Sequence, residues 1–254
     1  VRYDPWTIRI VELARHLQLR GHNITLGYIP KRKIEPHERP VHGSMPDAVQ
    51  VHQLGVRHSH LWKNTRSLEQ LARDADIVHI QKCFPSVAIP ALWAAYLADR
   101  PIHYDWDDHE SALAEIVESR SLYRHQISVC ERALPSLVDT ITYSSEGIRR
   151  IAIGRGFPDE RMRWAPVGAN LDRFTPGLDG TEIRERHGLD SETPLVLYVG
   201  QLEGASYAEL VVRAMEYVQP KFPNAVLWIV GGGKGLESLK ESCRNHSIGE
   251  NVRL

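Results

Sequence analysis

The chain alternates between segments with an apolar residue at every third or fourth position and short runs rich in Val, Ile and Leu. The first pattern is typical of amphipathic helices and the second of buried strands. The helices predicted from it cover residues 6–19, 67–73, 87–98, 146–153, 183–187, 208–219 and 236–245, and a helical region with unclear boundaries covers 111–137. The predicted strands cover residues 24–29, 48–54, 76–81, 101–106, 140–143, 163–165, 195–199 and 225–230, and another strand opens at Val252.

One stretch, from Asn170 to Thr193, interrupts this alternation: it contains Pro176, Gly177, Gly180 and Gly188 and has little apolar periodicity outside a short helix at 183–187. We therefore expect a first domain over residues 1–172, a linker over 173–193, and part of a second domain over 194–254. Alternation of helices with apolar strands predicts an α/β fold with two doubly wound, Rossmann-like parallel sheets and a cleft between them. Because the first domain opens on a helix and a strand is under way at Leu254, we expect both ends to be truncated and the second domain to be incomplete.

Composition narrows the class of protein. With 254 residues, 42% hydrophobic and 25% charged, the chain is typical of soluble globular proteins. Its net charge of −1 argues against a general nucleic-acid binder. The longest apolar run, 87–98, contains Pro90 and is too short to span a membrane. Cys83, Cys130 and Cys243 form no CxxC pair, which favours a reducing compartment and argues against a zinc site.

Ligands of open parallel sheets lie beyond the carboxyl ends of the strands. After the strand at 225–230 comes the turn Gly231-Gly232-Gly233-Lys234-Gly235, where glycines would let the backbone approach a phosphate at a helix N-terminus. The dinucleotide fingerprint GxGxxG fails because Leu236 stands at its last position, and no Walker motif is present. A tight connecting turn is the alternative. The loop at Gly200 and Gln201 follows a strand in the same way and is equally compatible with a plain connection.

An acidic cluster lies at the end of the strand predicted at 101–106. Asp105, Asp107, Asp108 and Glu110 place four carboxylates within six residues. Partial burial would raise some of their pKa values, so that one could act as a general base or two could hold a divalent cation. The Asp105-x-Asp107 spacing also resembles the DxD motif of metal-dependent glycosyltransferases of the other major fold. The alternative is a solvated loop with an Asp that caps the next helix.

Two polar groups are interpreted as surface features. His52, His58 and His60 lack a second well-spaced ligand pair, so surface histidines are favoured over a metal site. The run Lys31-Arg32-Lys33 could meet an anionic membrane surface or acceptor phosphates, but a run of three basic residues is usually a solvated loop.

Taken in order along the chain, six segments resemble the GT-B glycosyltransferases of family 4, the glycosyl transferase group 1 type. The similar motifs are LAxxLxxRGHxVT at Leu13–Thr25, a strand of the form D-apolar-VH at Asp76–His79, a strand ending in Ser at Asp139–Ser144, PNGVD…FxP at Pro166–Pro176, VGRL at Val199–Leu202, and IVGxG at Ile229–Gly233. Each motif is loose, and their order and spacing carry the match, which covers nearly the whole chain.

The resemblance implies transfer of a sugar from a UDP- or GDP-sugar donor to a hydroxyl of a glycan or lipid-linked acceptor, with retention at the anomeric carbon and with no metal or other cofactor. It implies a cytoplasmic enzyme of polysaccharide or glycolipid biosynthesis, with peripheral contact at the inner membrane face as an open alternative, and no nucleic-acid partner. The donor-binding residues would be Gly200, Gln201, Ser206, Gly231, Gly232 and Gly233. Gly168 and Asn170 would lie at the domain junction, and Asp107 and Asp108 near the reacting centre.

The chain departs from the family pattern at positions that matter for the charge at the donor. Gln201 and Ser206 replace the Arg and Lys that neutralise the leaving diphosphate, and Asp107 replaces the His of a His-Asp pair. Losing a fixed charge at a developing phosphate could cost ~2–4 kcal/mol of transition-state stabilisation per contact. The family's E-x7-E segment would lie beyond Leu254. A non-catalytic GT-B binding subunit, a metal-dependent transferase and a sugar-nucleotide epimerase are therefore the alternatives.

Overall fold

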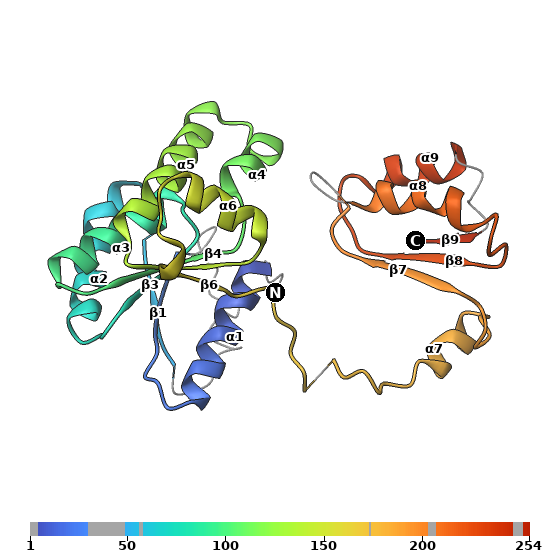
Figure 1. The fold of residues 1–254 in the computed structure, drawn as a ribbon, viewed down its shortest axis with the longest axis horizontal. Coiled ribbons are helices and arrows are strands. Elements are labelled where there is room, and N and C mark those ends of the chain that lie inside the picture. The colour runs from blue at the N-terminus through green and yellow to red at the C-terminus, as the bar shows by residue number, and fades with distance from the viewer. Residues whose placement is uncertain (1–4, 30–48, 56–57, 173, 203–206, 246–250) are drawn as a thin grey trace. The chain divides into compact units, whose positions relative to one another are not determined.

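The structure, a computed structural model, describes residues 5–29, 49–55, 58–172, 174–202, 207–245 and 251–254, with side chains from residue 8 onward and without that of His58. Contacts within the chain divide it into two compact units, residues 1–170 and 171–254 (Figure 1). Each unit is a parallel α/β assembly, so the predicted fold class is confirmed.

Unit 1 holds a two-stranded sheet, β1–β2, and a four-stranded sheet in the order β3–β4–β5–β6, all parallel. Its strands are β1 (Thr25–Tyr28), β2 (Gln50–Gln53), β3 (Val78–Gln81), β4 (Ile102–Trp106), β5 (Thr140–Tyr143) and β6 (Met162–Trp164). Its α-helices are α1 (Pro5–Leu19), α2 (Leu61–Arg73), α3 (Pro85–Leu97), α4 (Glu110–Val117), α5 (Ser121–Ala133) and α6 (Glu146–Gly154). Short 3-10 turns cover His58–His60, Leu134–Leu137 and Asp159–Arg161.

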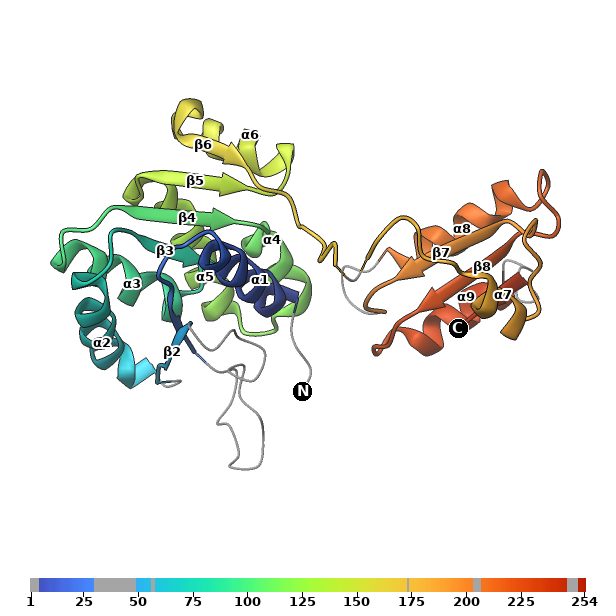
Figure 2. The same cartoon turned by 90° about the horizontal axis from the view of Figure 1, so that it is seen from below.

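The core of unit 1 lies on one face of the four-stranded sheet. Ile80, Tyr104, Ile141 and Met162 are register partners across the four strands, and each is at most 3% exposed. They pack against residues of α3, α5 and α6, which Figure 1 shows on one side of the sheet. Figure 2 looks onto the other side, where α1 lies in front of the strands. Because side chains alternate along a strand, the next residue of each strand faces the opposite side. That second face is polar.

The second face of the sheet meets α1, which Figure 1 shows apart from the other helices of the unit. Val11 and Ala14 of this helix are buried against Leu26 and Val51 of the two-stranded sheet. On its other side, Arg9 reaches the polar face of the four-stranded sheet. Helix α1 thus joins the two sheets of unit 1 through apolar packing on one and an ion pair on the other.

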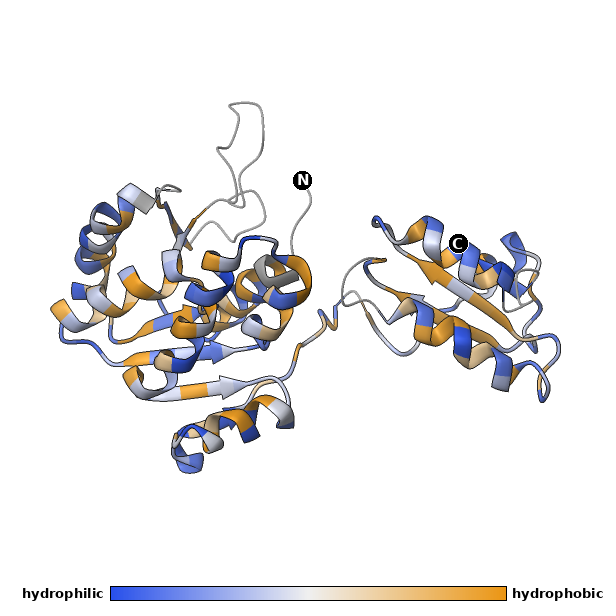
Figure 3. Cartoon of the chain, turned by 90° about the horizontal axis from the view of Figure 1, so that it is seen from above, coloured by the Kyte–Doolittle hydropathy of each residue, from blue (hydrophilic) through white to orange (hydrophobic). Residues whose placement is uncertain are grey.

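Unit 2 consists of α7 (Thr181–Arg186), β7 (Leu195–Val199), α8 (Ala208–Val218), β8 (Val226–Val230), α9 (Leu236–Asn245) and β9 (Val252–Arg253). Its parallel sheet has the order β7–β8–β9. Leu227 and Ile229 of β8 pack against Val212 and Met215 of α8 and against Leu239 of α9. Figure 3 shows the apolar residues of this unit gathered on the strands and on one side of the helices.

Two helix predictions need correction. Helix α2 begins at Leu61 and not at Ser67. The apolar pattern misses its first turns because their buried residues include the polar Asn64 and Thr65. Asn64 forms hydrogen bonds with Gly55, and Thr65 donates one to the carbonyl of Leu61. The helical region 111–137 is two helices and a 3-10 turn. The break follows Val117, where the Glu118 carboxylate accepts hydrogen bonds from the backbone and side chain of Arg120.

In the part of the chain that the structure describes, no helix combines the length and the apolar character needed to cross a membrane.

Candidate functional site

A lysine and three carboxylates meet where β3 and β4 end. The two strands are neighbours, with Gln81 opposite Asp105, so the residues that follow them lie side by side. The Nζ atom of Lys82 lies 2.9 Å from Oδ1 of Asp107, 2.6 Å from Oδ2 of Asp108 and 2.6 Å from Oε1 of Glu110. We call this group the Lys82 cluster. Three of the four carboxylates of the acidic cluster thus surround one cation, Lys82, which sequence reasoning did not single out.

The backbone of Lys82 is held in an unusual conformation. Its φ of 72° lies in the left-handed region, which non-glycine residues rarely adopt and which costs of order 1–3 kcal/mol. The residue is 5% exposed. Such a conformation persists only where the surroundings impose it, and here the three ion pairs provide that constraint.

Burial sets the protonation of the cluster. Burial raises the pKa of Glu110 to about 7, and the neighbouring Asp108 and Asp107 charges add to this effect against the opposing influence of Lys82. Burial also raises the pKa of Asp107. Burial alone would lower the pKa of Lys82, but the charges of Glu110 and Asp107 raise it well above its usual value. The lysine is therefore a permanent cation, and Glu110 titrates near neutral pH.

Asp105, by contrast, belongs to a separate structural ion pair. Arg9 donates from Nε to Oδ2 at 2.7 Å and from Nη2 to Oδ1 at 2.8 Å, and Thr142 donates to Oδ1 at 2.8 Å. Burial opposes ionisation of Asp105, but its hydrogen bonds with Arg9 and the charge of that residue lower its pKa. Asp105 and Asp107 thus contact different cations, and the structure does not bring them together as a DxD cation site.

Among the described residues, Asp107, Asp108 and Glu110 form the group whose ligand atoms lie close enough to hold a metal, all within 4.8 Å of one another. The Lys82 ammonium lies within 2.9 Å of an oxygen of each. It therefore supplies the positive charge that a cation would otherwise provide to these carboxylates.

Glu131 of α5 holds the loop that carries the Lys82 cluster. This carboxylate is fully buried and accepts hydrogen bonds from Trp106 Nε1 at 3.2 Å, from the backbone N–H of Glu110 at 2.7 Å and from that of Ser111 at 3.2 Å. A carboxylate at a helix N-terminus satisfies orphan N–H groups and complements the helix dipole. The alternative interpretation, in which an Asp caps this helix, is wrong: the N-cap residue of α4 is His109, whose side chain makes no cap hydrogen bond.

The two predicted catalytic carboxylates differ in exposure. The side chain of Asp107 is 8% exposed and that of Asp108 is 50% exposed. The backbone of Asp107 is fixed by Ser144 after β5, whose hydroxyl donates to its carbonyl oxygen at 2.5 Å. Asp108 is therefore the carboxylate of the Lys82 cluster that can reach a ligand in solution.

In unit 2, the loops after β7 and β8 are bonded to each other through their backbones. Gly200 N–H donates to the carbonyl of Val230, Leu202 N–H to that of Gly232, and Gly235 N–H to that of Leu202. A Cβ on Gly231 would overlap the carbonyl oxygen of Gly200. This position needs glycine because the two loops approach each other closely, so loop packing alone explains Gly231 without a ligand.

Gly232 has a different environment. A Cβ there would meet no atom within 4 Å, so its glycine is not required by packing. In the described part of the chain, the N–H groups of Gly232 and Gly233 donate to no carbonyl or side chain, and they precede the first turn of α9. Gln201 is exposed beside this turn. This geometry offers free backbone donors at a helix N-terminus, the arrangement that binds phosphate.

The remaining predicted positions are placed as follows. Gly168 is exposed in the loop after β6, and Asn170 is the last residue of unit 1. Ser206 and the run 31–33 lie outside the described residues, as does the side chain of His58. His52 is exposed as expected, but His60 is half-buried with its Nδ1 atom enclosed, so its assignment to the surface was wrong.

Comparison with protein families gives a match for each unit. Residues 7–168 match the model of the glycosyl transferase 4-like domain, and residues 179–254 match that of the glycosyl transferases group 1. A GDP-mannose-dependent α-(1-6)-phosphatidylinositol monomannoside mannosyltransferase of Mycolicibacterium smegmatis is 31% identical over 123 residues, 48% of this chain and 32% of the relative. A D-inositol 3-phosphate glycosyltransferase of Mycobacteroides abscessus is 29% identical over 195 residues, 74% of this chain and 38% of the relative.

Solved structures show the same fold. A glycosyltransferase of Rickettsia africae aligns with a TM-score of 0.65 at 13% identity, covering 97% of this chain and 63% of the other. A sucrose-phosphate synthase of Thermosynechococcus elongatus aligns at 0.66 and 16%, with the same coverage. Anabaena HepE, solved with UDP and glucose, aligns at 0.65 and 13%, covering 97% and 64%. The chain spans about a third of the length of the curated relatives and under two thirds of these structures.

Proposed function

Because this chain belongs to the glycosyl transferase 4-like and group 1 families of glycosyltransferases, we propose that the protein moves a sugar from a nucleotide-sugar donor to an acceptor hydroxyl with retention at the anomeric carbon and without a metal ion. Unit 2 binds the donor and unit 1 binds the acceptor. The proposal gives Gly232 and the Lys82 cluster separate roles.

The observation that carries the donor assignment is the turn after β8. A Cβ at Gly232 would meet no atom within 4 Å, and the backbone N–H groups of Gly232 and Gly233 precede α9. A diphosphate at this turn would accept these hydrogen bonds and meet the positive end of the helix dipole. Gly200 and Gln201 lie in the loop after β7, which is hydrogen-bonded to this turn, and Ser206 follows in the same loop of the sequence. These residues would add neutral hydrogen bonds in place of charge.

Metal independence is supported by the Lys82 cluster. Its ammonium already forms ion pairs with Asp107, Asp108 and Glu110 at distances of 2.9, 2.6 and 2.6 Å. Divalent cations would have to displace a buried lysine whose pKa is raised by these same carboxylates. In this proposal Asp108 orients the acceptor hydroxyl or the donor sugar. Lys82 lowers the pKa of Asp107 and so opposes the effect of burial on that carboxyl.

The acceptor class follows from the relatives. One is named for phosphatidylinositol monomannoside and another for inositol 3-phosphate, and both names describe inositol bearing a phosphate. Structural neighbours were solved with UDP and with UDP-glucose. We therefore propose a UDP- or GDP-sugar donor and a phosphate-bearing polyol, free or in a lipid headgroup, as the acceptor.

The test compares two glycines in the full-length protein. Gly232→Ala should leave stability unchanged but raise the donor KM by about 10–100-fold. The added methyl group would keep the phosphate from reaching the backbone N–H groups, and loss of a hydrogen bond to a charged group is worth about 1.5–3 kcal/mol. Gly177→Ala is the matched control, since a Cβ there also meets nothing within 4 Å. An unchanged donor KM for Gly232→Ala would remove the donor assignment from this turn.

A second experiment addresses the missing charges. Gln201→Arg combined with Ser206→Lys restores the two cations of the family pattern. If charge at the diphosphate limits the rate, the double variant should release nucleotide faster than the natural protein with the same donor. Unchanged turnover would show that the charge argument is wrong.

A further inference from the structure

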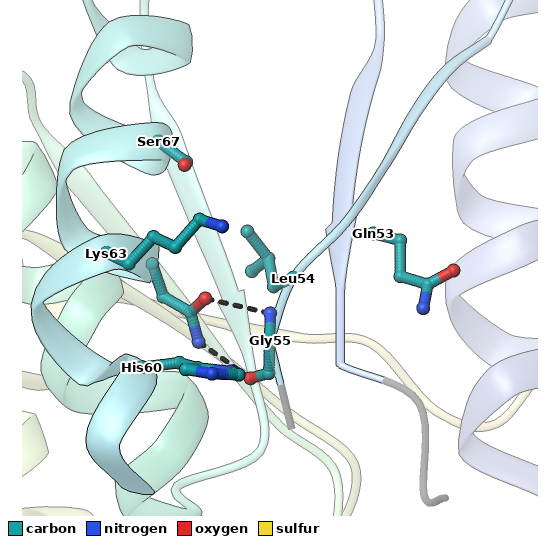
Figure 4. A pocket seen from close by; sticks show the side chains of 7 residues that line it. Gln53, Leu54, Gly55, His60, Lys63 and Ser67 are labelled. Carbon is teal, nitrogen blue, oxygen red and sulfur yellow. Dashed lines mark hydrogen bonds between the residues drawn. The ribbon is translucent and has the colours of Figure 1, made fainter. Parts of the chain in front are cut away.

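A small cavity lies just beyond the carboxyl end of β2, in unit 1 and apart from the Lys82 cluster in sequence. Its volume is about 230 Å³. The wall from the strand side is Gln53, Leu54 and Gly55, and the wall from the helix side is His60, Lys63, Asn64 and Ser67 (Figure 4). Sites for whole drug-sized ligands occupy ~300–1,000 Å³, so this cavity fits one substituent of a ligand better than a nucleotide-sugar.

The back of the cavity is rigid. Asn64 is buried, accepts a hydrogen bond from the Gly55 N–H at 2.8 Å and donates one to the Gly55 carbonyl at 2.9 Å. A Cβ on Gly55 would overlap the ring of His60. The imidazole is therefore packed directly on the glycine backbone, and its enclosed Nδ1 atom has no hydrogen-bond partner among the described residues. Asn64 and Gly55 satisfy each other and fix the wall on which the other side chains stand.

The open side of the cavity carries the unused polar groups. Lys63 and Ser67 are one helical turn apart on α2, and Figure 4 shows both on the side of the helix that faces Leu54 and Gly55. In the described part of the chain, Lys63 forms neither an ion pair nor a hydrogen bond. Among the residues that the structure describes, no carboxylate lines the cavity, so Lys63 gives this lining a net positive charge. The Lys63 ammonium, the Ser67 hydroxyl and an imidazole N–H of His60 are hydrogen-bond donors. Together they suit a small anion with several acceptor oxygens.

We propose that this cavity binds the phosphate group of the acceptor, with Lys63 as the charged contact and Ser67 as a hydrogen-bond donor. The proposal rests on the proposed function, because it assigns the cavity to the acceptor of that reaction. Lys63 is thereby a specificity-determining residue that distinguishes phosphorylated from unphosphorylated acceptors. A phosphomonoester of a free polyol and the phosphodiester of a lipid headgroup share this chemistry.

The kinetic test uses the full-length protein with inositol phosphate, phosphatidylinositol vesicles and unphosphorylated inositol as acceptors. Lys63→Met should raise the KM for whichever phosphorylated acceptor is used by about 10–100-fold, the range expected for one charged contact. The donor KM and any transfer to inositol should stay unchanged, and Lys63→Arg should restore most of the affinity. The acceptor that responds, soluble or vesicle-bound, identifies the source of the phosphate.

Arg66→Gln is the matched control, because it removes one positive charge from the same helix at a residue that stacks on Trp62 and does not line the cavity. An equal KM increase for Lys63→Met and Arg66→Gln would overturn the proposal, since general charge would then explain it. So would an equal loss for phosphorylated and unphosphorylated acceptors.

A binding measurement separates failure of this inference from failure of the proposed function. Inorganic phosphate titrated into the isotope-labelled full-length protein should shift the amide resonances of Gly55 and Asn64 in the natural protein and not in Lys63→Met. If these shifts occur without any sugar transfer, the cavity inference stands and the proposed function fails. If transfer occurs and phosphate leaves both resonances in place, the cavity inference fails alone.

Discussion

Replacing Lys82 with Met tests the electrostatic account of the Lys82 cluster. The substitution removes the charged end of the side chain and leaves an unbranched apolar chain of nearly the same length. The left-handed backbone of residue 82 is strained in both proteins, so this strain cancels in the comparison. The side chain of Lys82 is 6% exposed, and its ammonium lies within 2.9 Å of three carboxylates. Removing one partner of a buried ion pair leaves uncompensated charge and typically costs ~3–5 kcal/mol. We expect that loss in the free energy of unfolding at pH 8.

The loss should depend on pH with a defined sign. Without the ammonium, the pKa values of Asp107 and Glu110 rise further in the folded state, while the unfolded values stay near 4. A carboxyl group whose pKa is raised by folding does not change the free energy of unfolding below its unfolded pKa. It lowers that free energy as pH rises from the unfolded pKa through the folded pKa. The destabilisation should therefore shrink towards pH 5 and be largest at pH 8.

Urea denaturation at both pH values measures this effect. The matched control is Lys240→Met, which removes a lysine 2.7 Å from Glu237 in a pair whose side chains are 43% and 80% exposed. Exposed pairs are worth about 0–1 kcal/mol, so this control should change little. A loss for Lys82→Met no larger than for the control, or a loss that grows as pH falls, would refute the buried-cluster reasoning.

Three further predictions follow from other contacts. Gly231→Ala should destabilise unit 2 by about 1–3 kcal/mol in thermal or urea unfolding, because its Cβ would overlap the carbonyl of Gly200; a neutral effect would contradict this. Glu110→Gln should abolish one carboxyl titration near pH 7, seen by NMR of labelled Glu side chains, since burial raises the pKa of Glu110 to about 7; an unchanged titration would assign it elsewhere. Arg9→Met should cost ~3–5 kcal/mol by leaving Asp105 buried and unpaired, whereas a loss under 1 kcal/mol would show that Asp105 becomes hydrated.

The elements that sequence could predict best are those whose signal is local. The strands at Thr140–Tyr143 and Leu195–Val199 and the helix at Leu236–Asn245 have the predicted bounds. Each is a short stretch with one clear hydrophobic period and a turn on either side. The start of α2 was missed because the buried face of its first turns is polar, and Asn64 is satisfied by Gly55, a partner outside the helix.

The candidate site was predicted only in its local part. The acidic residues after β4 are visible in sequence because they are neighbours. Lys82 lies 26 positions before Asp108 in the chain, and only the pairing of β3 with β4 brings them together. Arg9 and Asp105 are 96 positions apart. No spacing rule reveals such pairs, but a lysine directly after a buried strand, next to a strand followed by acids, is the signal that could have suggested the first one.

The most direct test of the account is the stereochemistry of the transfer itself. The full-length protein is incubated with a panel of nucleotide-sugars and an inositol-phosphate acceptor in excess chelator, and the anomeric configuration of the product is read by NMR. The account predicts a product with the same anomeric configuration as the donor, formed at an undiminished rate under chelation. A product of inverted configuration, transfer that stops when divalent ions are removed, or no transfer from any donor would contradict it.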